Sequence, residues 1–125
     1  MFLGVIDLEC RAQQPYVIDE LLMQISTLDG VDGVSIVDGN GFSSRGFPQG
    51  METEKLAANV RGLIEKSDLD NQGIVTLIGE RGYILAFHLC RNEFLAIQAD
   101  KNAILGTIRS KGSEIAARIA NLMTS

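Results

Sequence analysis

Two stretches in the second half of the chain are apolar at nearly every position, and they limit the possible folds more than any other feature. They are Ile74–Ile78 ("IVTLI") and residues 83–89 ("YILAFHL"). A strand with one face in water alternates apolar and polar side chains, whereas a strand covered on both faces does not. The two stretches therefore predict a sheet with helices on each face, a three-layer α/β/α sandwich.

Apolar periodicity and turn residues divide the whole chain into helices and strands. Steps of three and four residues mark amphipathic helices, and β-branched runs between turn residues mark strands. Thr53 is the expected N-cap of the second helix, and Asp100 or Asn102 that of the third. Gly112 lies inside the third helix and should weaken it by about 1 kcal/mol relative to alanine, which allows a kink or break near residues 110–113. The predicted elements, in order, are a helix at 15–28, strands at 31–37 and 42–47, a helix at 53–66, strands at 74–79, 83–89 and 94–99, and a helix with its apolar stripe from Ile104 to Leu122.

The connections between these strands are mostly tight turns. Antiparallel strands can be joined in this way, while parallel strands need long crossovers. The chain is therefore expected to belong to the α+β class, with the order helix-strand-strand-helix-strand-strand-strand-helix and an antiparallel sheet. Residues 42–47 are short and polar, which predicts an edge strand.

Charge and composition exclude several classes of partner. The 125 residues carry 11 Lys and Arg against 16 Asp and Glu, a net charge of −5, with 46% hydrophobic residues. Without a basic surplus the sequence gives no support to nucleic-acid binding. The same acidic surplus argues against an anionic membrane surface. No apolar run approaches the roughly 20 residues that a membrane-spanning helix needs.

The chain is expected to form one domain, residues 14–123, preceded by an N-terminal arm or extra strand at residues 1–13. That arm is apolar, but it has neither the basic leader nor the cleavage site of a signal peptide. Cys10 and Cys90 have no metal-binding spacing and form no disulfide framework. A reduced, cytoplasmic setting is the expectation.

A glycine- and acid-rich stretch, residues 30–42 ("GVDGVSIVDGNGF"), has two possible uses. A phosphate-binding loop runs from a strand into a helix, so that free amides at the helix start meet the anion. Here Ser44 stands where the third glycine would fall after Gly39 and Gly41, and a strand follows. Asp-Gly and Asn-Gly pairs supply the positive φ angles of tight hairpins. A hairpin is therefore predicted, and no nucleotide cofactor.

Two further stretches imitate functional sites. Residues 68–73 ("DLDNQG") resemble the start of a calcium loop, but Gly79 occupies the position of its bidentate glutamate, so no metal is expected. His88 and Cys90 lie two apart on one strand and share a face. A nucleophile pair also needs an orienting third group. A satisfied or half-buried histidine on an apolar strand is the preferred interpretation, and no catalytic residue is expected.

The second predicted helix carries a strip with little side-chain bulk, formed by Ala58, Asn59 and Gly62. Small residues four apart allow another backbone to approach closely. This strip packs either on the domain's own sheet or on a second molecule. If Ile74–Ile78 also lies at a sheet edge, pairing with a second copy would protect it from aggregation. Dimerisation then follows.

These features together resemble the roadblock/dynein light chain family. "LDGVDGVSIVDGNGF" is similar to that family's first hairpin, "AILGTIR" (residues 103–109) to the opening of its last helix, and residues 74–99 to its three-strand meander. The resemblance covers residues 16–122. It implies a profilin-like fold with a five-stranded antiparallel sheet, one helix on one face and two on the other. The segment "SSRGFPQG" (residues 43–50) departs from the family pattern.

The resemblance also implies a function. Family members bind Ras-like small GTPases or act as scaffolds, and some stimulate GTP hydrolysis, so this chain is expected to be a non-catalytic homodimeric regulator. The third strand and second helix would form the dimer interface, through Ala58, Asn59, Gly62, Ile74, Thr76 and Ile78. The expected partner contacts are Glu54, Lys55, Arg61 and Glu65 on the second helix, with Arg45 in the adjoining loop.

Two other functions fit the same pattern of elements. A profilin- or PAS-like small-ligand sensor shares the helix-flanked sheet, but it needs a cavity lined by converging polar groups, and the sequence shows no such cluster. A thiol enzyme would use Cys90 with His88, and it requires a reactive, accessible thiol.

Overall fold

The computed structural model of the chain describes residues 17–38, 40–47, 51–66, 74–78, 82–89 and 93–124. A first helix covers residues 17–26 within this part. The elements that follow are β1 (Val31–Val37), β2 (Ser43–Phe47), α2 (Met51–Lys66), β3 (Ile74–Ile78), β4 (Gly82–His88), β5 (Phe94–Asp100) and α3 (Leu105–Thr124). The predicted α+β class and element order are confirmed. The predicted N-terminal arm lies outside the described residues.

The strands form one sheet in the order β2-β1-β5-β4-β3, and every neighbouring pair is antiparallel. β5 is the central strand, and its pairing with β1 joins strands far apart in the sequence. β2 lies at one edge, as its short polar sequence predicts. β3 lies at the other edge and pairs with β4.

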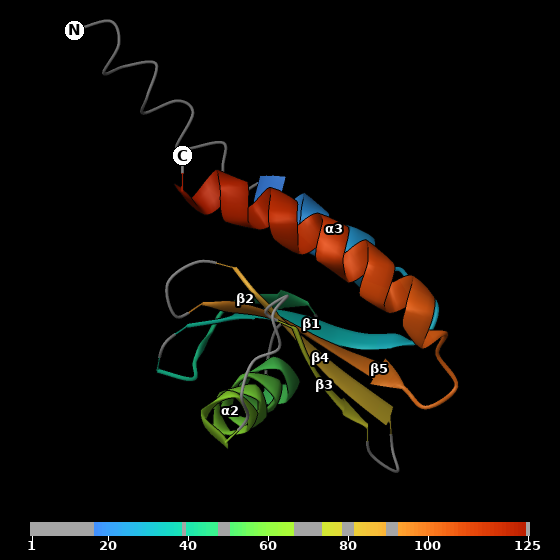
Figure 1. Ribbon diagram of the computed structural model, residues 1–125. Coiled ribbons are helices and arrows are strands. Elements are labelled where there is room, and N and C mark those ends of the chain that lie inside the picture. The colour runs from blue at the N-terminus through green and yellow to red at the C-terminus, as the bar shows by residue number, and fades with distance from the viewer. Residues whose placement is uncertain are drawn as a thin grey trace, which may run out of the picture.

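Helices cover both faces of the sheet (Figure 1). The first helix and α3 pack on one face, where the larger cluster of buried side chains includes Leu22, Ile25, Ile97 and Ile115. On the other face α2 packs with Leu56 and Val60 over a smaller cluster. The three-layer arrangement predicted from the apolar strands is thus confirmed.

The interior strand β4 is buried on both faces, which explains why its sequence does not alternate. Leu85 and Phe87 belong to the cluster under α3, whereas Ala86 belongs to the cluster under α2. All three are at most 3% exposed. Because both faces are dry, successive apolar side chains are each buried at a different interface.

The glycine- and acid-rich stretch folds as a hairpin. The Asp38 amide donates to the Phe42 carbonyl (3.0 Å), and the Asp38 carboxylate accepts from the amides of Asn40 (2.9 Å) and Phe42 (3.0 Å). Gly41 has φ of 84°, a conformation that glycine adopts without steric cost. The hairpin prediction is confirmed.

The predicted helix starts are wrong at two places. Thr53 lies inside α2, which begins at Met51, because Met51 and Glu52 are themselves good helix formers. Asp100 ends β5, where it pairs with Gly82, and its carboxylate accepts from the Asn102 amide (3.4 Å) in a turn. Neither Asp100 nor Asn102 caps α3, which begins at Leu105.

One residue of the predicted apolar stripe of α3 lies outside the helix. Ile104 precedes the helix and is 73% exposed, while Ile108, Ile115 and Ile119 of the same stripe are buried. The helix runs without interruption from Leu105 to Thr124, so no break occurs at residues 110–113.

Gly112 permits α3 to lie close to the sheet. A Cβ at this position would lie 2.7 Å from Cζ of Phe87 and 3.0 Å from Cδ1 of Ile97. Glycine at this position lowers the helix propensity of α3, but it is the residue that allows the helix to pack closely on β4 and β5.

Gly30 makes a similar close approach where the first helix leads into β1. Its φ is 86°, its carbonyl accepts from the Asp100 amide (2.6 Å), and an added Cβ would lie 2.5 Å from Cβ of Ala103. The backbones of the turn before β1 and of the turn before α3 are thus in direct contact.

Candidate functional site

The helix α2 has a buried face and an outer face that carries a strip with little side-chain bulk. Leu56, Ala57 and Val60 are buried against the sheet. Ala58 and Asn59 are exposed, and a Cβ on Gly62 would meet nothing within 4 Å. We call Ala58, Asn59 and Gly62 the α2 strip. Of the two alternatives weighed for it, packing on the domain's own sheet is wrong, because the strip points away from that sheet.

The second predicted interface element, β3, lies at the margin of the sheet opposite β2. Its register with β4 places Ile74 opposite Phe87, Thr76 opposite Leu85 and Ile78 opposite Tyr83. Within the described part of the chain, β4 is the only strand that pairs with it. The other side of β3 therefore presents backbone amides and carbonyls that another strand can bind.

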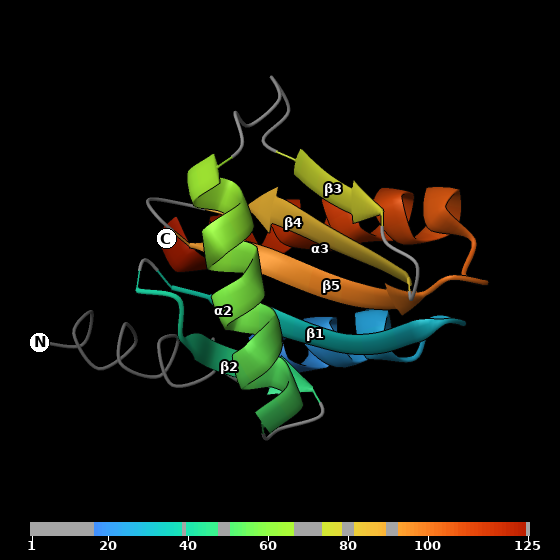
Figure 2. The ribbon, with the colours of Figure 1, turned by 90° about the horizontal axis from the view of Figure 1, so that it is seen from below.

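Within the residues that the structure describes, α2 does not lie over β3. Figure 2 shows that α2 crosses the sheet, while β3 lies beyond it at the opposite margin from β2. The helix packs mainly on β1, β2 and β5. The α2 strip and the β3 edge are thus accessible from the same side of the molecule.

Four of the five predicted partner contacts lie on α2. Glu54 and Lys55 are exposed, and Arg61 is half-buried beside the hairpin turn at Gly41. Glu65 lies in the last turn of the helix, but its side chain is outside the described residues. Glu54, Lys55 and Arg61 therefore flank the α2 strip, where a partner can reach them.

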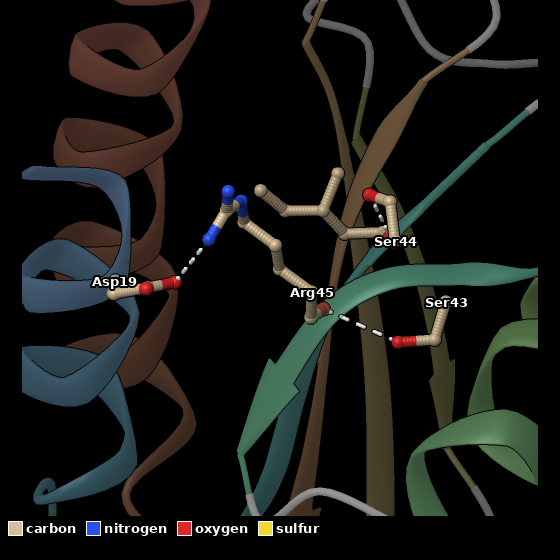
Figure 3. A network of polar contacts seen from close by, with 5 residues as sticks. Asp19, Ser43, Ser44 and Arg45 are labelled. Atoms are coloured by element: carbon tan, nitrogen blue, oxygen red, sulfur yellow. Dashed lines mark hydrogen bonds and ion pairs between the residues drawn. The ribbon is translucent and has the colours of Figure 1, made fainter. Parts of the chain in front are cut away.

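The fifth predicted contact, Arg45, is wrongly placed in a loop. It lies in β2, opposite Ile36, and Nη1 donates to Oδ1 of Asp19 on the first helix at 2.8 Å (Figure 3). The pair is on the face away from α2, because the first helix packs on that face of the sheet. Both side chains are about one-third exposed or more, so the ion pair stabilises the fold by about 0.2–1 kcal/mol at most.

Serine hydroxyls attach β2 to β1. Ser35, fully buried, donates to Ser43 Oγ (2.7 Å), and Ser43 donates to the Arg45 carbonyl (3.2 Å). Ser44 donates to the Ile36 carbonyl (3.2 Å), as Figure 3 shows. This role was not predicted from the sequence, although a lone serine within the apolar run of β1 indicates it.

The other candidate sites of the sequence lie partly outside the described residues. His88 is exposed, not half-buried, and its ring lies edge-on to Phe94 with centroids 5.3 Å apart. It is on the α2 face, beside Phe94 of the cluster under α2. Cys90 and residues 68–73 are not described. In the described ranges, no three acidic, histidine or cysteine side chains lie close enough to hold a metal ion.

None of the helices in the described part of the chain combines the length and the apolar character that a bilayer span requires.

No protein-family model and no curated protein matches the sequence. Solved structures do match the fold. A Roadblock/LC7 domain from Streptomyces avermitilis superposes with a TM-score of 0.73 at 11% identity, covering 86% of this chain and 98% of that domain. Gliding protein MglB from Thermus thermophilus superposes with a TM-score of 0.70 at 19% identity, covering 84% of this chain and 87% of MglB.

A structure described as MglB with tetrameric arrangement has a TM-score of 0.72 at 18% identity, covering 86% of this chain and 88% of MglB. Each of these superpositions covers at least 84% of this chain and at least 87% of the other. The chain has the Roadblock/LC7 fold.

Proposed function

We propose that the protein is a homodimeric, non-catalytic regulator or scaffold of the roadblock type, and that it binds a Ras-like small GTPase. The observation that carries the proposal is the edge position of β3, beside a helix whose outer face is bare. Both features suit a second copy of the chain. The GTPase, in this proposal, supplies the chemistry.

The sequence of β3 makes an unpaired edge costly. Ile74–Ile78 contains no charge and no proline, which are the residues that protect exposed edges in monomeric proteins. Antiparallel pairing with the β3 of a second copy satisfies the open backbone groups and produces a continuous sheet. The two α2 helices then approach along their strips, since Ala58 and Gly62 leave room for a neighbouring backbone.

The dimer is tested by adding bulk to the α2 strip. Gly62→Gln should raise the dimer dissociation constant by tenfold or more, because the side chain separates the helices, and overpacking costs about 1–3 kcal/mol. The monomer fold should not suffer, since Gln is a better helix former than Gly. Sedimentation equilibrium measures the constant.

The matched control is Gly106→Gln on α3, where an added Cβ also meets nothing within 4 Å. This variant should dimerise like the wild type. A wild-type chain that stays monomeric at micromolar concentration, or equal effects of the two substitutions, would contradict the proposed interface.

The proposed GTPase contact rests on the family resemblance and on the charges that flank the α2 strip. Glu54 and Lys55 are exposed. Charges at the rim of an interface act mainly on the association rate and on the choice of partner. A dimer places two copies of this charged surface side by side, which gives a partner a wider platform than one domain offers.

The contact is tested by pull-down with the small GTPases encoded by the same genome, loaded with GTP analogue or GDP. We expect one of them to bind preferentially in one nucleotide state, and Lys55→Glu to weaken that binding several-fold. Arg118→Glu, an exposed charge reversal on α3, serves as the control and should leave binding unchanged. Absence of nucleotide-dependent binding to every such GTPase would refute the regulatory function while leaving the dimer intact.

A further inference from the structure

A polar contact joins α3 to the open edge of the sheet. Arg109, half-buried on α3, donates from Nη1 to Oγ1 of Thr76 at 3.3 Å. Thr76 is the middle residue of β3 and lies opposite Leu85, which belongs to the cluster under α3. Among the residues that the structure describes, no carboxylate forms an ion pair with Arg109. A positive charge is therefore held over the middle of the edge strand.

The symmetry of the proposed homodimer, on which this inference rests, fixes what lies opposite Thr76. Directly opposed residues of an antiparallel pair have their side chains on the same face of the sheet. A two-fold axis perpendicular to the sheet maps each face onto itself, so residues of opposite faces cannot oppose one another. Some residue of β3 must then face its own copy. When all five residues pair, that residue is Thr76.

The same axis brings two arginines together. The Cβ atoms of the two Thr76 side chains would be about 5 Å apart, and each hydroxyl accepts a hydrogen bond from one Arg109. The two guanidinium groups are thus brought near the axis on the α3 face. Because both are positively charged, they repel one another there. Each guanidinium has five N–H donors, and one contact to threonine leaves others to bind an acceptor.

We propose that Arg109 and Thr76 of both protomers form a binding site for a small dianionic oxyanion, with free inorganic phosphate as the type, on the two-fold axis. Guanidinium groups bind phosphate through paired, charge-assisted hydrogen bonds. One anion on the axis accepts from both arginines and cancels their repulsion. Half of the site belongs to each copy, so the anion binds only the dimer and stabilises it.

The experiment compares the dimer dissociation constant of the full chain in sodium phosphate and in sodium chloride of equal ionic strength, by sedimentation equilibrium. Phosphate should lower this constant about tenfold when its concentration is about ten times the dissociation constant of the site. In Arg109→Gln the two salts should give the same constant. Arg118→Gln, on the exposed side of the same helix, should keep the response to phosphate.

A second comparison separates anion binding from a merely structural bond. If Arg109 only anchored β3, Arg109→Gln would weaken the dimer equally in both salts. The anion site predicts that in chloride Arg109→Gln dimerises as tightly as the wild type or more tightly, because the repulsion is gone. Thr76→Ser keeps the hydroxyl and should keep the phosphate response.

The outcomes distinguish this site from the proposed dimer. A wild-type dimer of equal affinity in both salts overturns the anion site and leaves the dimer standing. A chain that is monomeric in both salts overturns the dimer, and the site with it. If Arg109→Gln weakens the dimer equally in both salts, Arg109 has only a structural role, and the anion site is overturned.

Discussion

Replacing Gly30 with alanine should lower the free energy of unfolding by about 3 kcal/mol, measured by urea denaturation at fixed protein concentration. The φ of 86° costs a residue with a Cβ about 1–2 kcal/mol. The new Cβ would also lie 2.5 Å from Cβ of Ala103, and such overpacking costs about 1–3 kcal/mol. Protein concentration is held constant because association adds to the apparent stability of a dimer.

The two contributions at Gly30 can be separated by a double variant. Adding Ala103→Gly removes the nearest atom that the new Cβ meets but leaves Cα of residue 103 at 2.9 Å, so the double variant should regain part of the packing loss and retain the backbone strain of about 1–2 kcal/mol. The two substitutions are thus expected to be strongly non-additive. A double variant no more stable than Gly30→Ala alone would show that the Cβ of Ala103 contributes nothing to the packing loss.

Gly112→Val is expected to destabilise the protein by at least about 3 kcal/mol. The first added carbon would already lie 2.7 Å from Cζ of Phe87, and valine adds two methyl groups to this carbon with little freedom at χ1. The helix would have to move away from β4 and β5, and cores resist such expansion because they are close-packed.

The control for Gly112 is the same substitution at Gly106, which lies on the same helix with open space around it. Gly106→Val should change the free energy of unfolding by only a few tenths of a kcal/mol, since valine has a somewhat better helix propensity than glycine. Urea denaturation of both variants under the same conditions gives the comparison. Equal losses at the two positions would mean that helix propensity, and not contact with Phe87, limits position 112.

The sequence predicted the layers because burial leaves a local pattern. β4 is apolar at successive positions since it is covered from both sides, and the hairpin follows from the turn chemistry of residues 38–41. The edge position of β2 follows from its short polar sequence. These features are determined within a few residues, and each was correctly predicted.

The errors have non-local causes. Arg45 was expected near α2, yet its ion pair with Asp19 depends on which face of β2 turns toward the first helix. Ile104 fits the stripe of α3, but the turn after β5 ends one residue later than the pattern indicates, which leaves Ile104 in water. The contact of Arg109 with Thr76 joins residues 33 positions apart and required the sheet order. The partner contacts and the dimer interface remain predictions.

The two edge strands of the sheet, β2 and β3, differ in how readily they can pair with a strand of another chain. β2 carries a charged arginine, and it is held to β1 by serine hydroxyls and to the first helix by an ion pair, whereas β3 has the same length and no charged residue. Of the two edge strands that the structure describes, only β3 is apolar and free to accept a strand. If two chains pair through β3, as proposed, each copy is left with β2 at its outer margin. We therefore expect assembly to stop at two chains along the sheet, because β2 is not suited to add another strand.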